Sequence, residues 1–220
     1  MASSVKTDPY VMNLLAKTLN GKRMLSLQKG ETFFSQGDRS DAIFFIQGGH
    51  VKVSVVSGSG KEAVIAMLGP HDFFGEGCLV GQSLRMNTVT TLEGTTVFRV
   101  EKSAMVRALQ SQPELAKTFM SALMSRNITT EEDLCAQLLN DSEKRLARVL
   151  LKLDRLRDHD VMIDDTLPFL SHETMAEMVG TTRSRVTHFM NKFRKQGLID
   201  YDNSGFTVRT DKLNDMVLHN

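Results

Sequence analysis

Hydrophobic and polar residues alternate with a period of two over the first part of the chain, from about Met24 to Val100. The segment DAIFFIQGGHVKVSVVSGSGKEAVIAMLGP combines aromatic and β-branched residues with turn signals at Gly48-Gly49, Gly58-Ser59-Gly60 and Gly69-Pro70. Strands this short, joined by tight turns, leave no room for connecting helices. The pattern therefore predicts antiparallel strands in a sandwich or barrel.

A helical period replaces this alternation near Glu101, and the longest helix is predicted from Pro113 to about Leu139. The stretch has no glycine and no internal proline. Pro113 suits the first turn of a helix, and Glu114 favours the positive end of the helix dipole. At about 1.5 Å per residue the helix is about 40 Å long, which is more than one small domain covers. We therefore expect it to contact a second copy of the chain.

Two faces of this long helix carry apolar residues. The face expected to meet the second copy has heptad-like spacing with polar interruptions. Its members are Ala116, Met120, Leu123, Asn127, Thr130, Leu134 and Gln137. The other face is expected to pack on the chain's own β domain and comprises Leu115, Phe119, Ala122 and Ile128. The alternative interpretation is a monomer that buries the whole helix.

Beyond Asn140 the sequence predicts a small helical unit. Asp141 and Ser142 are capping residues before the helical stretch EKRLARVLLKLDRL. The acidic, proline-containing RDHDVMIDDTLPFLS indicates a loop or a short hairpin. Two short helices follow, SHETMAEMVG and TTRSRVTHFMNKFRKQG, each with a hydroxyl residue at its start and a glycine after it. The segment IDYDNSGFTVRT alternates around a turn and predicts a small β wing.

The two short helices form a helix-turn-helix pattern around Gly180. Apolar positions give each helix an inner face, with Met175, Met178 and Val179 on the first and Val186, Phe189, Met190 and Phe193 on the second. Between Gly180 and Leu198 the chain carries five cations and no carboxylate, although its formal net charge is only +1. Because cations at the start of the second helix project outward, the pattern favours binding in the DNA major groove over an ordinary solvated face.

The residues expected to touch DNA begin at the cap of the second helix and are Thr182, Arg183, Ser184, Arg185, His188 and Lys192. Arg183 is the expected base reader, since an arginine fork matches O6 and N7 of guanine. Arg185, Lys192 and Lys195 are expected to contact phosphates, which carry no sequence information.

Composition, cysteine count and the motifs that are missing argue against several other classes of protein. A chain of 220 residues with 41% hydrophobic and 24% charged residues is expected to be a soluble protein of one or two domains. Cys78 and Cys135 are too few for a disulfide framework, a zinc site or an iron-sulfur cluster, so no metal is expected. The N-terminus lacks a signal peptide and no window approaches a membrane span, which predicts a cytoplasmic protein. The absence of a nucleophile elbow, P-loop or paired catalytic carboxylates argues against an enzyme.

Over nearly all of its 220 residues the chain resembles the CRP/FNR family of bacterial transcription regulators. The most specific stretches are QKGETFFSQGDRSDAIFFIQGGHVKV, FFGEG followed by Arg85, and ETMAEMVGTTRSRV. The resemblance implies an α+β fold in three parts. These are a cyclic-nucleotide-binding-type β-roll over residues 1–112, a dimerisation helix over 113–140 and a winged helix-turn-helix DNA-binding domain over 141–220.

The same resemblance implies a homodimeric regulator that binds a palindromic operator in double-stranded DNA and works with RNA polymerase. No cofactor is required, and the implied effector is a cyclic nucleotide, cyclic AMP or cyclic GMP, in the β-roll. By resemblance, Glu76 accepts the ribose 2′-hydroxyl and Arg85 pairs with the cyclic phosphate. The full set of implied effector contacts is Gly75, Glu76, Gly77, Cys78, Arg85, Met86, Asn87, Thr129 and Thr130.

Departures from the family pattern keep a second interpretation open. Met86 stands where serine or threonine usually follows the arginine, and Cys78 lies where a more apolar pair is common. Thr130 matches a base-contacting hydroxyl of cyclic-AMP-binding members, yet a threonine on a helix can equally bond a backbone carbonyl. The alternative is the same DNA-binding regulator with a different small-molecule effector or none. Ser184 and His188 replace a glutamate and an arginine of the best-known members, so a different operator sequence is expected.

Overall fold

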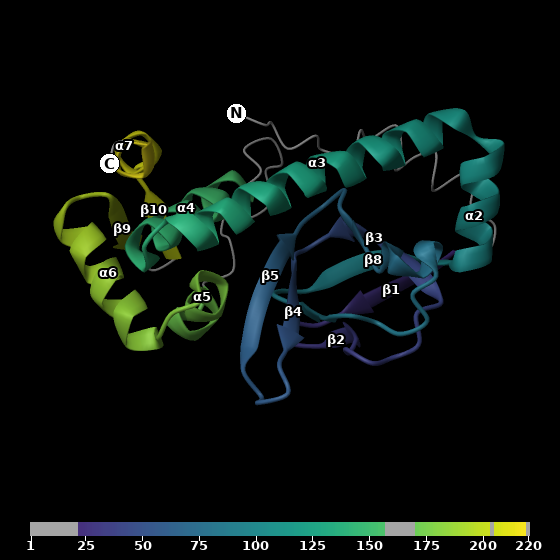
Figure 1. The fold of residues 1–220 in the computed structure, drawn as a ribbon, viewed down its shortest axis with the longest axis horizontal. Coiled ribbons are helices and arrows are strands. Elements are labelled where there is room, and N and C mark those ends of the chain that lie inside the picture. The colour runs from purple at the N-terminus through teal and green to yellow at the C-terminus, as the bar shows by residue number, and fades with distance from the viewer. Residues whose placement is uncertain (1–21, 157–169, 203–204, 219–220) are drawn as a thin grey trace. The chain divides into compact units, whose positions relative to one another are not determined.

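The computed structural model describes residues 22–156, 170–202 and 205–218 (Figure 1). The chain divides into two compact units, the first ending at Glu132 and the second beginning at Asp133. The long helix α3 (Pro113–Leu139) begins in the first unit and ends in the second. The first unit is built mainly from strands and the second mainly from helices, which confirms the predicted α+β class.

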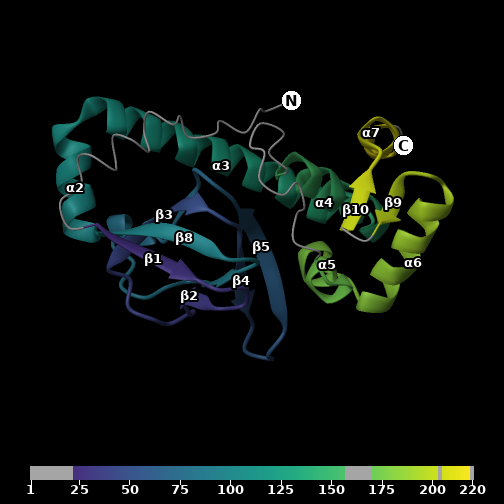
Figure 2. The same ribbon diagram turned by 180° about the vertical axis from the view of Figure 1, so that it is seen from behind.

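From residue 22 onward the first unit forms two antiparallel sheets of four strands each, seen from opposite sides in Figures 1 and 2. One sheet has the order β1-β8-β3-β6 and the other β2-β7-β4-β5. Short strands and tight turns were expected from the sequence, and this part of the prediction is confirmed. The strands are β1 (Arg23–Leu27), β2 (Thr32–Phe34), β3 (Ala42–Gly48), β4 (Val51–Val56), β5 (Glu62–Leu68), β6 (Phe73–Phe74), β7 (Thr88–Thr91) and β8 (Thr95–Glu101).

Glycine is required at the turn between β3 and β4. Gly49 has a φ of 85°, in the left-handed region that side chains disfavour. A Cβ atom there would lie 2.5 Å from the carbonyl oxygen of Gly94. The predicted turn therefore depends on glycine for both its backbone conformation and its space.

Strand β3 is buried on both faces, which explains its continuous apolar sequence. Ile43 and Phe45 belong to one core cluster, with Phe73 of β6 and Met105 of the following helix α2 (Lys102–Ser111). Phe44 and its alternating neighbours on β3 belong to a second cluster between the two sheets. There the rings of Phe44 and Phe74 stack with their centroids 4.9 Å apart. Because side chains alternate across a strand, both clusters draw on the same short segment.

The face of α3 that packs on the β-roll differs in two residues from the expected one. Leu115 and Phe119 are buried in the cluster around Ile43, and Ala122 packs against it as predicted. Leu123 also packs there, although it was expected on the seam with a second copy. Ile128, expected on this face, is exposed.

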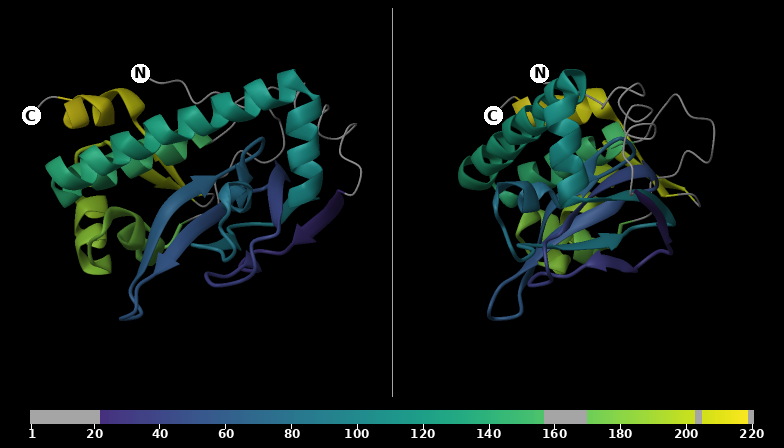
Figure 3. Two further views of the ribbon diagram at one scale, coloured as in Figure 1. Left: turned by 45° about the vertical axis from the view of Figure 1, so that its right-hand side comes forward. Right: turned by 90° about the vertical axis from the view of Figure 1, so that its right-hand side faces the viewer.

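Beyond the end of α3, the described residues of the second unit form four helices and a two-stranded wing. Its elements are α4 (Ser142–Leu156), α5 (His172–Val179), α6 (Arg183–Lys195), β9 (Ile199–Asp202), β10 (Gly205–Val208) and α7 (Thr210–Leu218). Strands β9 and β10 pair antiparallel, which confirms the predicted wing (Figure 3). Helix α7 was not predicted, and most of the segment expected to form a loop or hairpin lies outside the described residues. No helix in the described ranges is long and apolar enough to cross a membrane.

Candidate effector pocket and nucleic-acid interface

The segment with the predicted effector residues runs from the end of β6 through the short 3₁₀ helix η1 (Glu76–Val80) to β7. Gly75 precedes η1 with a φ of 81°. A Cβ atom at this position would lie 2.6 Å from Nη1 of Arg85. Glycine is needed here because the backbone is left-handed and because Arg85 lies directly over it.

Arg85 is buried, with only 5% of its surface exposed. Its Nη1 donates to the carbonyl of Gly75 at 2.9 Å and its Nη2 to the carbonyl of Ala42 at 2.8 Å. The guanidinium also lies 4.2 Å from the centre of the Phe34 ring. Burial lowers the pKa of Arg85. Its Nε is buried and has no hydrogen-bond partner among the described residues. The group expected to grip a phosphate therefore already bonds two backbone carbonyls.

Glu76 is paired as well, with a residue that the sequence did not single out. Nη1 of Arg126, on α3, lies 2.8 Å from a carboxylate oxygen of Glu76. Arg126 also donates to the carbonyl of Phe73 and lies 4.8 Å from the centre of the Phe73 ring. Arg126 follows Phe119 by seven residues and so shares the helix face that packs on the β-roll. That spacing is the sequence signal that could have found it.

The other predicted effector residues vary in their access to a ligand. Cys78 is fully buried in the core, and burial raises the pKa of its thiol. Gly77 is covered by the side chain of Gln82, whereas Met86 is exposed and Asn87 is half-buried. The structure thus places Gly75 and Glu76 at the start of η1, with Arg85 bonded to the Gly75 carbonyl, and buries Cys78 in the adjoining core.

Thr129 and Thr130 are exposed on α3, and both hydroxyls bond the helix's own backbone. Thr129 donates to the carbonyl of Ser125 at 3.1 Å and Thr130 to that of Arg126 at 2.9 Å. This is the ordinary role that the sequence left open for Thr130. A base contact by either residue stays a prediction.

The helix-turn-helix has well-defined caps. The Ser171 hydroxyl accepts from the backbone N–H of Thr174 at 3.1 Å, and Gly180 ends α5 with a φ of 69°. Thr182 caps α6 by accepting from the backbone N–H of Arg185 at 3.4 Å. The predicted inner face is buried at Val186, Phe189, Met190 and Phe193 on α6, and at Met175 and Val179 on α5. The two helices therefore pack mainly through the residues that the periodicity selected, and Met178, the remaining predicted position, is half-buried.

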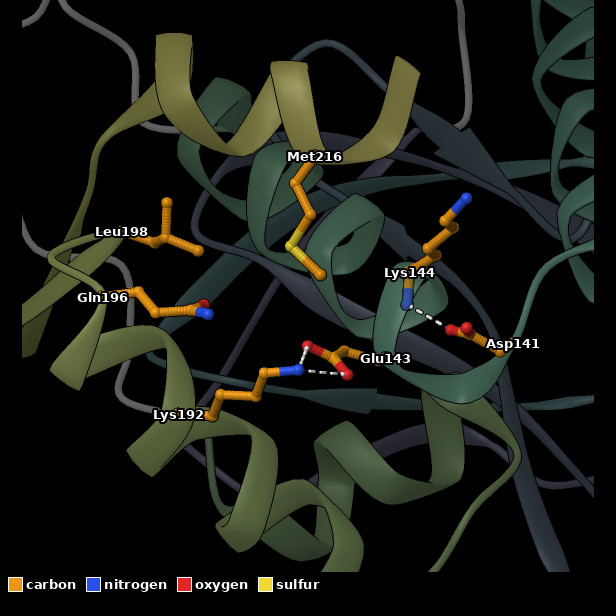
Figure 4. A pocket seen from close by; sticks show the side chains of 7 residues that line it. All are labelled: Asp141, Glu143, Lys144, Lys192, Gln196, Leu198 and Met216. Carbon is orange, nitrogen blue, oxygen red and sulfur yellow. Dashed lines mark hydrogen bonds and ion pairs between the residues drawn. The ribbon is translucent and has the colours of Figure 1, made fainter. Parts of the chain in front are cut away.

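All six residues expected to touch DNA are exposed: Thr182, Arg183, Ser184, Arg185, His188 and Lys192. The guanidinium of Arg185 lies 5.8 Å from the centre of the Phe189 ring. The ammonium of Lys192 lies 2.7 Å from a carboxylate oxygen of Glu143, on α4. Figure 4 shows this pair in a groove lined also by Asp141, Lys144, Gln196, Leu198 and Met216. A phosphate contact by Lys192 thus stays a prediction, because a carboxylate already neutralises its charge.

Comparison with known proteins identifies the family to which this pair of units belongs. A protein-family model described as a cyclic nucleotide-binding domain matches residues 24–112. A second family model, described as a Crp-like helix-turn-helix domain, matches residues 144–215. The chain is 32% identical over 197 residues to a global nitrogen regulator of Synechococcus elongatus, covering 86% of this chain and 88% of that protein. The chain belongs to the CRP/FNR family. The resemblance inferred from the sequence is thereby confirmed.

A second curated relative of this CRP/FNR protein is named as a transcription regulator, and a solved structure has the same fold. A CRP-like cAMP-activated global transcriptional regulator of Mycobacterium tuberculosis is 25% identical over 193 residues, covering 87% of this chain and 85% of that protein. The structure of FixK2 from Bradyrhizobium japonicum aligns with a TM-score of 0.77 at 18% identity, covering 89% of this chain and 97% of that one. Within the described part of the chain, no group of three or more His, Cys, Asp or Glu side chains is arranged to hold a metal ion.

In this CRP/FNR protein a histidine connects the two helices of the DNA-binding motif. Nδ1 of His172, on α5, lies 2.8 Å from the hydroxyl of Thr187, on α6. Burial, and then the nearby positive charge of Arg183, lower the pKa of His172 below its ordinary value of 6.5. The folded chain therefore favours the neutral imidazole at this contact.

We expect the second unit to lose stability as the pH falls through about 6.5 and below. Because the pKa of His172 is lower in the folded chain, the unfolded chain binds the proton more readily. The contribution of His172 is thus complete above the unfolded pKa and is lost as the pH falls toward the folded one. Urea unfolding of the wild type and of His172→Gln, followed at pH 7.5 and 5.5, should show a smaller acid loss in the variant. Equal losses would contradict this role of His172.

Proposed function

We propose that the chain is a homodimeric, sequence-specific DNA-binding transcription regulator, switched by a cyclic nucleotide bound in the β-roll. The observation that carries the DNA-binding part is α6, which buries Val186 and Phe193 and exposes a cationic outer face without carboxylates. The expected target is a two-fold symmetric operator with half-sites about 34 Å apart, one helical turn. Regulation on such a site takes place in the cytoplasm, with RNA polymerase as the further partner.

A row of exposed residues on α3 supports the dimer. Positions three and four apart along the helix form a heptad row that does not include Leu115, Phe119 or Leu123, which pack on the β-roll. Its members, in order, are Lys117, Met120, Met124, Asn127, Glu131, Leu134 and Leu138, and each is exposed. We call these residues the α3 seam. It keeps Met120, Asn127 and Leu134 of the expected seam and replaces Ala116, Leu123, Thr130 and Gln137.

Two observations support the effector pocket. Glu76 and Arg85 belong to the stretch FFGEG and the arginine after it, which by resemblance to the family contact the ribose and the cyclic phosphate, and a relative is named as cAMP-activated. In addition, Arg126 connects Glu76 directly to α3. A ribose hydroxyl that bonds Glu76 must either share the Glu76 carboxylate with Arg126 or displace Arg126 from it. Occupation of the pocket therefore changes a contact of the helix that forms the dimer. A ligand shifts a conformational equilibrium only through such differential contacts.

The alternative is the same regulator with another small-molecule effector or none. This alternative is favoured because Glu76 and Arg85, the two residues expected to bind the nucleotide, already have partners within the chain. Met86 also supplies no hydroxyl for a phosphate. The relative at 32% identity is named as a global nitrogen regulator, and its name specifies no cyclic nucleotide.

Calorimetry with cyclic AMP and cyclic GMP tests the switch. We expect binding that Glu76→Gln weakens by about tenfold or more, because hydrogen bonds to a charged group contribute about 1.5–3 kcal/mol. Arg126→Gln should instead strengthen binding several-fold, since the ligand no longer competes with an ion pair for Glu76. Glu132→Gln, an exposed change on α3, is the matched control and should leave binding unaltered.

Each outcome of this experiment decides between the two candidates. Absence of binding by both nucleotides at millimolar concentration would contradict a cyclic nucleotide as effector and favour the alternative. Binding without a change in operator affinity would support the pocket but contradict the switch. Neither result affects the DNA-binding function, which is measured separately on the operator.

A further inference from the structure

The outer face of α6 contains a polar residue that the expected DNA contacts leave out. Four side chains recur at intervals of four and three residues on the side opposite the buried Val186, Phe189, Met190 and Phe193. They are Ser184, His188, Asn191 and Lys195, and all four are exposed. Asn191 therefore lies in the middle of the surface that would enter the major groove.

Within the described part of the chain the polar atoms of Asn191 are unoccupied, whereas those of several neighbouring side chains have partners. Among the described residues its carboxamide makes no hydrogen bond, whereas Ser184 lies within 3.1 Å of the Thr182 hydroxyl. The Thr187 hydroxyl bonds both the Arg183 carbonyl and His172. Lys192 pairs with Glu143. The amide of Asn191 is thus available to an incoming ligand without loss of an existing contact.

The position along the helix also fits a base contact. Asn191 follows Ser184 by seven residues, which is about 10 Å along the helix axis. The major groove is about 12 Å wide, so both residues can reach base edges in one groove. Asparagine is a poor helix former, and among the described residues no side-chain hydrogen bond of the exposed Asn191 offsets that cost.

We propose that Asn191 reads an adenine in each half-site of the operator. Its Nδ2 donates to N7 of the adenine, and its Oδ1 accepts from the N6 amino group, which is the bidentate match of a carboxamide to adenine. An uncharged amide gains little from phosphates compared with Lys195, so its contribution is to sequence preference rather than to general affinity. This proposal rests on the proposed DNA-binding function.

The experiment begins with selection of binding sites from random duplex DNA by the wild-type protein, with and without cyclic AMP and cyclic GMP. Affinities are then measured for the selected site and all its single-base variants. Asn191→Ala should lose about tenfold or more of its preference at one adenine per half-site and keep the preference elsewhere. The salt dependence of DNA binding by this variant should equal that of the wild type, because no charge is removed. Lys195→Ala is the control, which should weaken binding to all sequences. It should also lower the slope of the logarithm of the binding constant against the logarithm of the salt concentration by about one.

A base analogue makes the test specific for the proposed atoms. Replacing that adenine by 7-deazaadenine removes N7 alone, and it should weaken binding of the wild type but not of Asn191→Ala. Unaltered base preference of the variant at every position, or equal sensitivity of both proteins to the analogue, would overturn the proposal. If the wild type selects no site at all, the DNA-binding function fails, which is a distinct result. Asn191 is exposed and alanine favours helix, so the variant is expected to fold.

Discussion

Replacing Met124 and Leu138 together by glutamate should convert the proposed dimer into a monomer. In the single chain these side chains are 61% and 73% exposed, and both lie on the α3 seam. Burial of such a side chain contributes about 1.5–3 kcal/mol, so the four of them in a dimer contribute on the order of 6–12 kcal/mol. A micromolar dimer has only about 8 kcal/mol in total. Light scattering at micromolar concentration should give the mass of one chain.

Two control variants separate the seam from the rest of α3. Ser125→Glu adds one glutamate on another face of α3 and should leave the dimer intact. Leu123→Glu places a charge against the core cluster of the β-roll and should lower the stability of the first unit. A Met124 and Leu138 double variant that stays dimeric would show that the chains associate through another surface.

Arg183→Ala removes the preference for guanine at one position of each half-site. Loss of a bidentate arginine–guanine pair costs about 1–3 kcal/mol, which is roughly a 5- to 150-fold loss of discrimination. The side chain is exposed at the first position of α6, where a fork can reach a base edge. Competition binding with the selected operator and its single-base variants measures this loss.

Arg183→Lys is the matched variant for this prediction. It keeps the positive charge but loses the planar fork, so it should bind random DNA almost as well as the wild type and still lose the guanine preference. If Arg183→Ala retained the full base preference, Arg183 would be a phosphate contact instead. A selected site identical to that of the cyclic-AMP activators would contradict the shift expected from Ser184 and His188.

Much of the fold could be predicted because its signals are local. The strand period, the turn at Gly49 and the caps at Ser171 and Thr182 are properties of a few neighbouring residues, and the structure contains each of them. The inner face of α6 follows from its 3.6-residue period in the same way. Helix α7 was missed, although Thr210 and Asp211 at its start are typical N-terminal residues.

The sequence of α3 does not predict which of its apolar rows packs on the β-roll and which stays exposed. The helix has apolar residues over most of its circumference, so several heptad-like rows fit equally well. Packing on the β-roll takes Leu115, Phe119 and Leu123, and the row that stays exposed includes Met124 and Leu138. Only the position of the roll against the helix decides which row is left for a partner.

The sequence by itself determined the order of the elements, the antiparallel strands, the helix-turn-helix and the charge of its outer face, because these depend on residues close together in the chain. The tertiary structure decided the state of the candidate pocket. Glu76 meets Arg126 from 50 residues away, and Arg85 bonds the carbonyl of Ala42 from 43 residues away. Helix spacing places Arg126 on the face that meets the β-roll, but it does not specify Glu76 as the partner, since such contacts form only when the strands and α3 pack together.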